Sequence, residues 1–166
     1  MTATRSGELG EQEQQDLRDW FREHWEQGVA FNRDCALSVR QWTPECAELA
    51  IPYAERLSAH DGVFHGGVIS ALIDSAGGAA VMAGHDFAKG SRLSTVSLSV
   101  QYLLPAVGAE VVAQARCVRR GGRIHFSEVE VRRADGQACA RGQVVVSISG
   151  KRPGAPATTH KPTAGT

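Results

Sequence analysis

The chain has 166 residues, enough for one domain with a full hydrophobic core and too few for two ordinary ones. Basic and acidic residues balance at 18 each, so the charge gives no case for binding nucleic acid or an anionic membrane surface. The first residues contain no apolar run that could act as a secretory signal, and we expect a cytoplasmic protein.

The cysteines agree with a reducing compartment. They lie far apart without a Cys-x-x-Cys pair, so we expect reduced thiols that mostly serve as small core residues. The same spacing does not predict a zinc site. The four are Cys35, Cys46, Cys117 and Cys139.

Both ends of the chain, residues 1–10 and 150–166, are predicted to be disordered, and residues 11–149 are predicted to form one domain. Apolar residues recur at helical spacing from Glu11 to Val29, which predicts a helix that packs on the core. Two short strands are predicted next, Cys35–Trp42 and Cys46–Pro52, separated by a turn. Residues 54–64 are expected to form a loop.

The segment from Gly67 to Ala83 is apolar on almost every side, which is typical of a buried helix. Two glycines and two alanines stand in a row at 77–80, although glycine costs a helix roughly 1 kcal/mol relative to alanine. Such small residues make sense if a strand surface approaches the helix axis closely. The single charge, Asp74, and the glycines argue against a membrane-spanning helix.

After a polar connection at 85–92, four strands are predicted: Ser94–Leu104, Glu110–Arg119, Arg123–Arg133 and Gln137–Ser149. Because the strands are grouped and do not alternate with helices, we expect an α+β fold in which an antiparallel meander wraps one long buried helix. A single sheet of this kind leaves an edge strand and an uncovered face, so a homodimer is expected.

The tripeptide His65-Gly66-Gly67 directly precedes the buried helix. Backbone N–H groups at a helix start have no partner within the helix, and glycines let a ligand atom come close to them. Together with the positive end of the helix dipole, these donors could hold a carbonyl oxygen that becomes negative during a reaction. A simple glycine-rich bend at the helix entry explains the tripeptide equally well.

Asp74 lies two turns further along the helix. A carboxylate on a buried helix is costly unless it is paired, hydrogen-bonded or used, so we favour a functional role as a base or a nucleophile. The structural alternative is an aspartate satisfied by Ser70 or Ser75.

Two other groups of side chains give weaker signals. Histidines and aspartates near both ends of the helix show no spacing that suits a metal, so we predict no metal and no cofactor. Arg119, Arg120 and Arg123 cluster at one hairpin and could grip phosphates, although such a cluster is more often a solvated surface.

Taken together, His65-Gly66-Gly67, Leu72, Asp74 and the run STVSLSVQYLLP at 94–105 resemble the hotdog-fold acyl-CoA thioesterases of the phenylacetate-pathway (PaaI-like) type. The resemblance spans about residues 33–149. It implies a hotdog fold, one long buried helix wrapped by a curved antiparallel sheet, paired as a homodimer that forms a dimer of dimers.

The resemblance also implies roles for single residues. Asp74 would be the nucleophile or general base, and the Gly66 N–H would polarise the thioester carbonyl. Thr95 would help to place the water across the subunit interface, and His65 would shape the loop and line the site. The substrate is expected to contact Gly67, His60, Gly62, Arg120 and Arg123. Ala59 stands where the family usually has an asparagine or glutamine, which puts the catalytic assignment in question.

These features predict hydrolysis of an acyl-CoA, aromatic or medium-chain, to a free acid and CoA. A hotdog module that binds acyl-CoA or another apolar ligand without catalysis is the alternative, and Ala59 favours it. A dehydratase on the same fold is less favoured because its catalytic histidine normally pairs with an acid on the helix, whereas His65 precedes the helix.

Overall fold

The computed structural model describes residues 9–150. The segments predicted to be disordered therefore lie outside the described residues, apart from positions 9, 10 and 150. The first helix begins at Glu11 and the last strand ends at Ser149. The predicted domain limits at 11 and 149 stay predictions.

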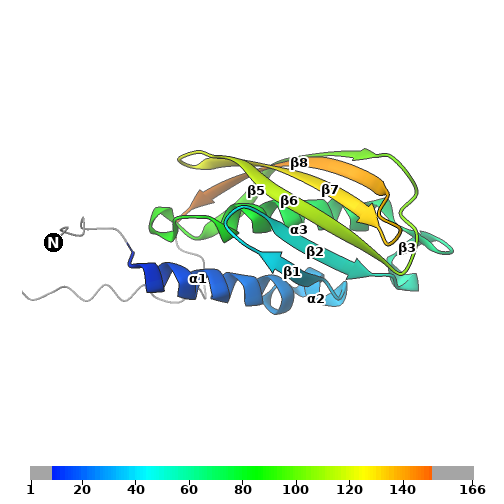
Figure 1. Cartoon of the computed structure of the whole chain (residues 1–166), viewed down its shortest axis with the longest axis horizontal. Coiled ribbons are helices and arrows are strands. Elements are labelled where there is room, and N and C mark those ends of the chain that lie inside the picture. Colours follow the sequence, from blue (N-terminus) through cyan, green and yellow to red (C-terminus); the bar gives the residue numbers. More distant parts are fainter. Residues whose placement is uncertain (1–8, 151–166) are drawn as a thin grey trace, which may run out of the picture.

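The long helix α3 (Gly66–Ala83) is the centre of the molecule, and a six-stranded antiparallel sheet curves around it (Figure 1). The order across the sheet is β1-β2-β6-β7-β8-β5. The strands are β1 (Ser38–Trp42), β2 (Ala47–Pro52), β6 (Glu110–Arg120), β7 (Ile124–Arg133), β8 (Ala138–Ser149) and β5 (Arg92–Tyr102). The predicted α+β fold is confirmed.

The glycines of α3 allow the sheet to pack close to the helix axis. A Cβ atom added at Gly77 would lie 2.5 Å from Val144 Cγ2 and 2.7 Å from Ser127 Oγ. From the other side, a Cβ atom at Gly142 would lie 2.5 Å from Ile73 Cγ2. No real Cβ contact is that short, so the expected close approach of a strand surface is confirmed.

α3 is long and apolar enough to cross a membrane by length and composition alone. Most of it is buried within the protein, however, with Leu72, Ile73 and Met82 completely inaccessible. Its burial against the sheet makes it the core helix of this fold.

The segment predicted as one helix from Glu11 to Val29 packs on the core as expected, but it is not one continuous α-helix. Residues 11–29 divide into α1 (Glu11–Glu23) and a π-helical turn, η1 (His24–Gly28), and α2 (Ala30–Asp34) follows. Gly28 permits the wide turn, because a Cβ atom there would lie 2.0 Å from His24 Nδ1. Trp25 is buried and donates its indole N–H to the Ser75 carbonyl at 3.0 Å, which ties this segment to α3.

Two further predictions need correction. The expected loop at 54–64 contains a 3-10 turn, η2 (Glu55–Leu57), and a small hairpin of β3 (Ser58–His60) and β4 (Val63–Phe64). A second 3-10 turn, η3 (Phe87–Lys89), lies in the connection after α3. In addition, β5 does not begin a meander beside β6; it pairs with β8 at the far edge of the sheet.

β5 is a bare edge strand with a β-bulge between Thr95 and Ser97. The extra residue, Val96, is 60% exposed. Because a bulge inserts one residue, side chains an odd number of positions apart can face the same side of the strand. Thr95 and Tyr102 both reach α3 as a result, although strict alternation would place residues seven positions apart on opposite faces.

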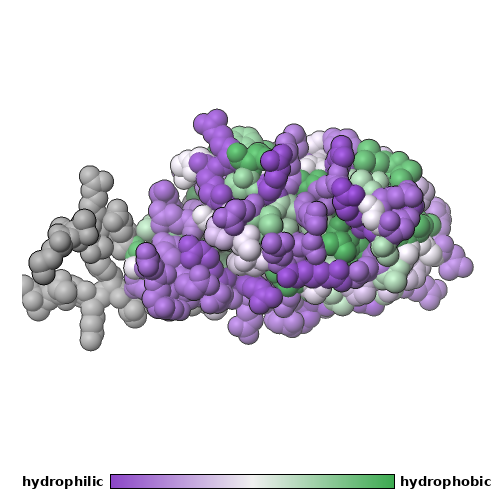
Figure 2. Space-filling view, viewed as in Figure 1, coloured by the Kyte–Doolittle hydropathy of each residue, from purple (hydrophilic) through white to green (hydrophobic). Residues whose placement is uncertain are grey.

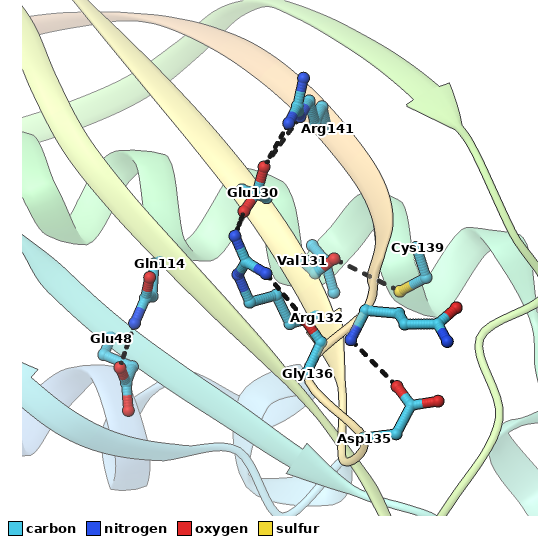
Figure 3. A network of polar contacts seen from close by, with 10 residues as sticks. Glu48, Gln114, Glu130, Val131, Arg132, Asp135, Gly136, Cys139 and Arg141 are labelled. Atoms are coloured by element: carbon cyan, nitrogen blue, oxygen red, sulfur yellow. Dashed lines mark hydrogen bonds and ion pairs between the residues drawn. The ribbon is translucent and has the colours of Figure 1, made fainter.

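The outer face of the sheet, turned away from α3, is mainly hydrophilic (Figure 2). Figure 3 shows Glu130 of β7 between Arg141 of β8 and Arg132, with Glu48 and Gln114 paired on the neighbouring strands. A hollow of about 780 Å³ lies over this polar face, and none of the predicted site residues lines it.

Candidate active site

Asp74 is half-buried on α3 and accepts a hydrogen bond from the Thr95 hydroxyl at 2.8 Å. No other hydrogen bond to its carboxylate occurs within residues 9–150. The two serines that could have satisfied it are engaged elsewhere: Ser70 contacts Tyr102, and Ser75 donates to Asn32 Oδ1 at 3.2 Å. The carboxylate is held in position by Thr95 and keeps an oxygen for chemistry.

Thr95 belongs to the same chain as the Asp74 it contacts. The β-bulge that follows Thr95 lies directly next to this contact. The expected role of Thr95 across a subunit interface stays a prediction.

The start of α3 is built from His65-Gly66-Gly67. His65 is the N-cap residue with extended backbone (φ −64°, ψ 135°), and its Nδ1 accepts the Gly67 N–H at 2.9 Å. The His65 carbonyl accepts the N–H groups of Val68 and Ile69. Among the described residues, no acceptor pairs with the Gly66 N–H, which therefore remains available to a ligand oxygen.

Asp74 and the Gly66 N–H cannot act on one carbonyl within a single chain. They lie eight residues apart on one helix, and with a rise of 1.5 Å per residue this separates them by about 12 Å along the axis. A base and an oxyanion donor must both lie near hydrogen-bonding distance of the reacting group.

Tyr102, the last residue of β5, was not predicted as a site residue. Its hydroxyl donates to the Gly66 carbonyl at 2.9 Å and also contacts Ser70 Oγ. Its ring borders an apolar depression of about 330 Å³ beside Gly66, where Phe64 and Ile69 are among the lining residues. Sequence reasoning could have identified Tyr102 from its position, because it ends a strand that faces the glycine-rich start of a helix.

The hairpin before α3 carries three further positions of interest. Ala59 and His60 lie on β3 and are exposed. Gly62 forms the turn with φ 74°, a left-handed conformation that favours glycine, and its N–H is bonded to Tyr53 Oη at 3.0 Å. The conformation of the turn accounts for Gly62, whereas the structure shows no contact that draws His60 toward Gly66.

The predicted arginine cluster lies at the other end of α3. Arg120 donates to the carbonyls of Pro44 at 2.8 Å and of Ala80 at 3.0 Å, so it satisfies a carbonyl in the last turn of the helix. Arg123 is exposed in the β6–β7 turn. Ala80 is 14 residues from Gly66, about 21 Å along the helix, which separates Arg120 from the helix start of its own chain.

Within residues 9–150, no group of three or more histidine, cysteine, aspartate or glutamate side chains is arranged to hold a metal ion. The chemistry available to the described residues is that of a carboxylate, a hydroxyl and a backbone donor.

Comparison with solved structures decides the fold. A crystal structure of a Shewanella oneidensis protein related to the thioesterase superfamily superposes with a TM-score of 0.73 at 22% identity, over 82% of this chain and 97% of that one. Residues 61–140 also match the model of the thioesterase superfamily. The chain has the hotdog fold. The phenylacetate-pathway type stays a prediction.

Two curated relatives agree with this fold. A predicted esterase of Halobacterium salinarum is 40% identical over 86 residues, which cover 50% of this chain and 56% of that protein. The medium/long-chain acyl-CoA thioesterase YigI of Escherichia coli is 26% identical over 116 residues, 62% of this chain and 75% of that protein. The match thus spans little more than half the length of the halobacterial relative.

Proposed function

We propose that this protein is a thioester hydrolase that cleaves an acyl-CoA, aromatic or medium-chain, to a free acid and CoA. The observation that carries the proposal is the pair of groups on α3: the Asp74 carboxylate held by Thr95, and the unpaired Gly66 N–H at the helix start. The similarity to the acyl-CoA thioesterase YigI supports the choice of substrate class.

The reaction needs two proton transfers and one bond exchange. Asp74 takes a proton from water, and the resulting hydroxide adds to the thioester carbonyl carbon. The carbonyl oxygen becomes an oxyanion that the Gly66 N–H stabilises. The carbon–sulfur bond then breaks, and the thiolate of CoA takes up the proton that Asp74 holds, which returns the carboxylate to its starting state. Direct attack by Asp74, through an anhydride that water hydrolyses, satisfies the same geometry.

The 12 Å separation on the helix implies that each site uses two copies of the chain, in which Gly66 of one faces Asp74 of the other. The bare edge of β5 provides a surface for a second copy. Apolar side chains on and after this strand are exposed, among them Val96, Tyr102 and Leu103. We therefore propose a cytoplasmic homodimer, which can assemble further into a dimer of dimers.

Thiol release from short, medium, long and aromatic acyl-CoAs tests the proposal. Asp74→Asn keeps the shape of the side chain and removes the base, so we expect kcat to fall by roughly 10²-fold or more. Asp19→Asn, on the exposed face of α1, is the control and should retain wild-type rates. If the wild type hydrolyses an acyl-CoA and the Asp74→Asn variant does so at the same rate, the proposal is wrong.

Ala59 supports a second candidate, a module that binds acyl-CoA without cleaving it. Ala59 lies on β3 where the family that this sequence resembles usually has an amide side chain. Calorimetry distinguishes the two candidates. Acyl-CoA binding to the wild type without any thiol release would favour the binding module.

A further inference from the structure

Both peptide planes that flank Gly66 are fixed by hydrogen bonds. In the plane before it, the His65 carbonyl accepts from the N–H groups of Val68 and Ile69. In the plane after it, the Gly67 N–H donates to His65 Nδ1 at 2.9 Å, and the Gly66 carbonyl accepts from Tyr102 Oη at 2.9 Å. The Gly66 N–H is the group of these two planes that has no partner within the described residues.

Of these hydrogen bonds, the one that Tyr102 donates connects β5 to the first turn of α3. A glycine has more backbone freedom than any other residue, so two consecutive glycines at a helix start are prone to rotate unless they are held. A tyrosine hydroxyl has a single hydrogen, which Tyr102 gives to the Gly66 carbonyl; Ser70 must then donate its own hydrogen to Tyr102. The Tyr102 hydroxyl thus has both a donor and an acceptor partner on the first turn of α3.

The ring of Tyr102 lies beside Gly66. A Cβ atom added at Gly66 would be 3.4 Å from the ring carbon Cζ, an ordinary van der Waals contact. The same ring borders the apolar depression of about 330 Å³, together with Ile69 and Leu104. Gly66 and Tyr102 thus both line an apolar surface that an acyl chain could contact.

We propose that Tyr102 is a positioning residue that holds the peptide plane after Gly66, and thereby limits rotation at Gly66 so that the free N–H of the adjoining plane points at the thioester carbonyl. This inference rests on the proposed thioesterase function. Tyr102 acts through the Gly66 backbone and not on the reacting atoms, and its hydroxyl fixes the donor before the substrate arrives. A donor that is already oriented costs no reorganisation when the oxyanion forms.

Tyr102→Phe removes the hydroxyl and keeps the ring. With an acyl-CoA that the wild type hydrolyses in an Asp74-dependent manner, we expect kcat to fall about tenfold while KM changes less than about twofold. Ser70→Ala, which leaves the bond from Tyr102 to Gly66 in place, should cause a smaller fall in kcat. Thr43→Val is the control, because its hydroxyl bonds Cys46 near Pro44 at the opposite end of α3.

The outcomes separate this inference from the proposed function. If Asp74→Asn abolishes hydrolysis but Tyr102→Phe keeps kcat within about twofold of the wild type, the positioning role is wrong and the function stands. A rise in KM at unchanged kcat also contradicts it, because it would make Tyr102 a ground-state binding residue. If Tyr102→Phe does not fold, Ser70→Ala decides: a lower kcat at constant KM supports the inference, and an unchanged kcat overturns it.

Discussion

The hydroxyl of Thr95 and the carboxylate of Asp74 form the contact on which the proposed chemistry depends. A hydrogen bond to an ionised carboxylate is stronger than one between neutral groups, and it also limits the rotation of the acid. Asp74 is half-buried and hence open to a substrate, and the serines next to it have other partners. This placement supports the functional role that we propose for Asp74.

Two buried histidines make folding depend on pH. His85, just after α3, and His125 of β7 lie with their rings at right angles and 5.4 Å between centroids. Burial lowers the pKa of His85 from 6.5 to about 4, against the opposing effect of a bond to the Gly90 carbonyl. Burial and the nearby charge of Arg120 also lower the pKa of His125, whose ring nitrogens have no hydrogen-bond partner among the described residues.

A lowered pKa means that the unfolded chain binds these protons more readily than the folded one. Stability is therefore complete above pH 6.5 and is lost as the pH falls toward 4. For His85 the loss can reach about 3 kcal/mol. We expect His85→Gln, which can still donate to the Gly90 carbonyl but cannot titrate, to lose less stability on acidification than the wild type. Urea unfolding at several pH values measures this.

Ser38→Ala, an exposed change on β1 that adds and removes no titratable group, provides the control for this experiment and should leave the pH dependence of unfolding unchanged. Asp86 and Lys89 also lie close to His85, so both must be kept intact in the comparison. Equal losses of stability in the wild type and in His85→Gln would show that His85 does not carry the effect.

At the level of single residues, sequence reasoning found the groups that belong to local patterns. Asp74 stood out as the one charge on an apolar helix, and Gly66 as part of a helix start. Tyr102 was missed because its contact with Gly66 joins residues 36 positions apart. The position of Arg120 was equally unpredictable, since its partner carbonyls lie on two distant segments.

At the scale of elements, the contact between α3 and the sheet depends on glycine. We expect Gly77→Ala to lower the free energy of unfolding by about 1–2 kcal/mol, because overpacking costs about 1–3 kcal/mol and the gain in helix propensity returns up to about 1 kcal/mol. The methyl group would press against Val144 and Ser127 of the sheet. Thermal or urea unfolding of the variant measures the change.

Gly78→Ala is the matched comparison on the same helix. Its Cβ atom would lie 3.2 Å from the ring edge of Trp25, a contact that a small shift can relieve, so the cost should be smaller. Should Gly77→Ala prove as stable as the wild type, the sheet is not in rigid contact with α3.

The pattern of the elements shows where sequence reasoning succeeds. Apolar periodicity identified α3 and the four long strands, because each is defined by its own residues. The place of β5 next to β8 depends on pairing between segments distant in the chain, which periodicity does not encode. The bulge at Val96 is likewise a feature of the pairing between β5 and β8, and it shifts the alternation of faces along β5.

At the scale of the whole molecule, the proposed site exists only between two copies. Gly66→Pro removes the N–H group of the first helical residue, a position that tolerates proline, and Asp74→Asn removes the acid. Each variant alone should be inactive. When the two are mixed and allowed to exchange subunits, half of the dimers are mixed and each contains one intact site, so about a quarter of the wild-type activity should return.

Two observations make this experiment decisive. Size-exclusion chromatography with light scattering establishes that both variants are dimers before they are mixed. If each variant is inactive and a mixed population still shows no activity, Gly66 and Asp74 do not combine across subunits. Activity in either variant alone would remove the corresponding residue from the site.

The bond from Trp25 to the carbonyl of Ser75 has a practical consequence. Ser75 is the neighbour of Asp74, and the indole is only 6% exposed. Indole fluorescence responds to its hydrogen bonding and to the polarity around it. Once Trp20 and Trp42 are replaced by phenylalanine, Trp25 becomes an intrinsic optical reporter one residue away from the candidate acid, and no dye has to be attached to follow what happens there.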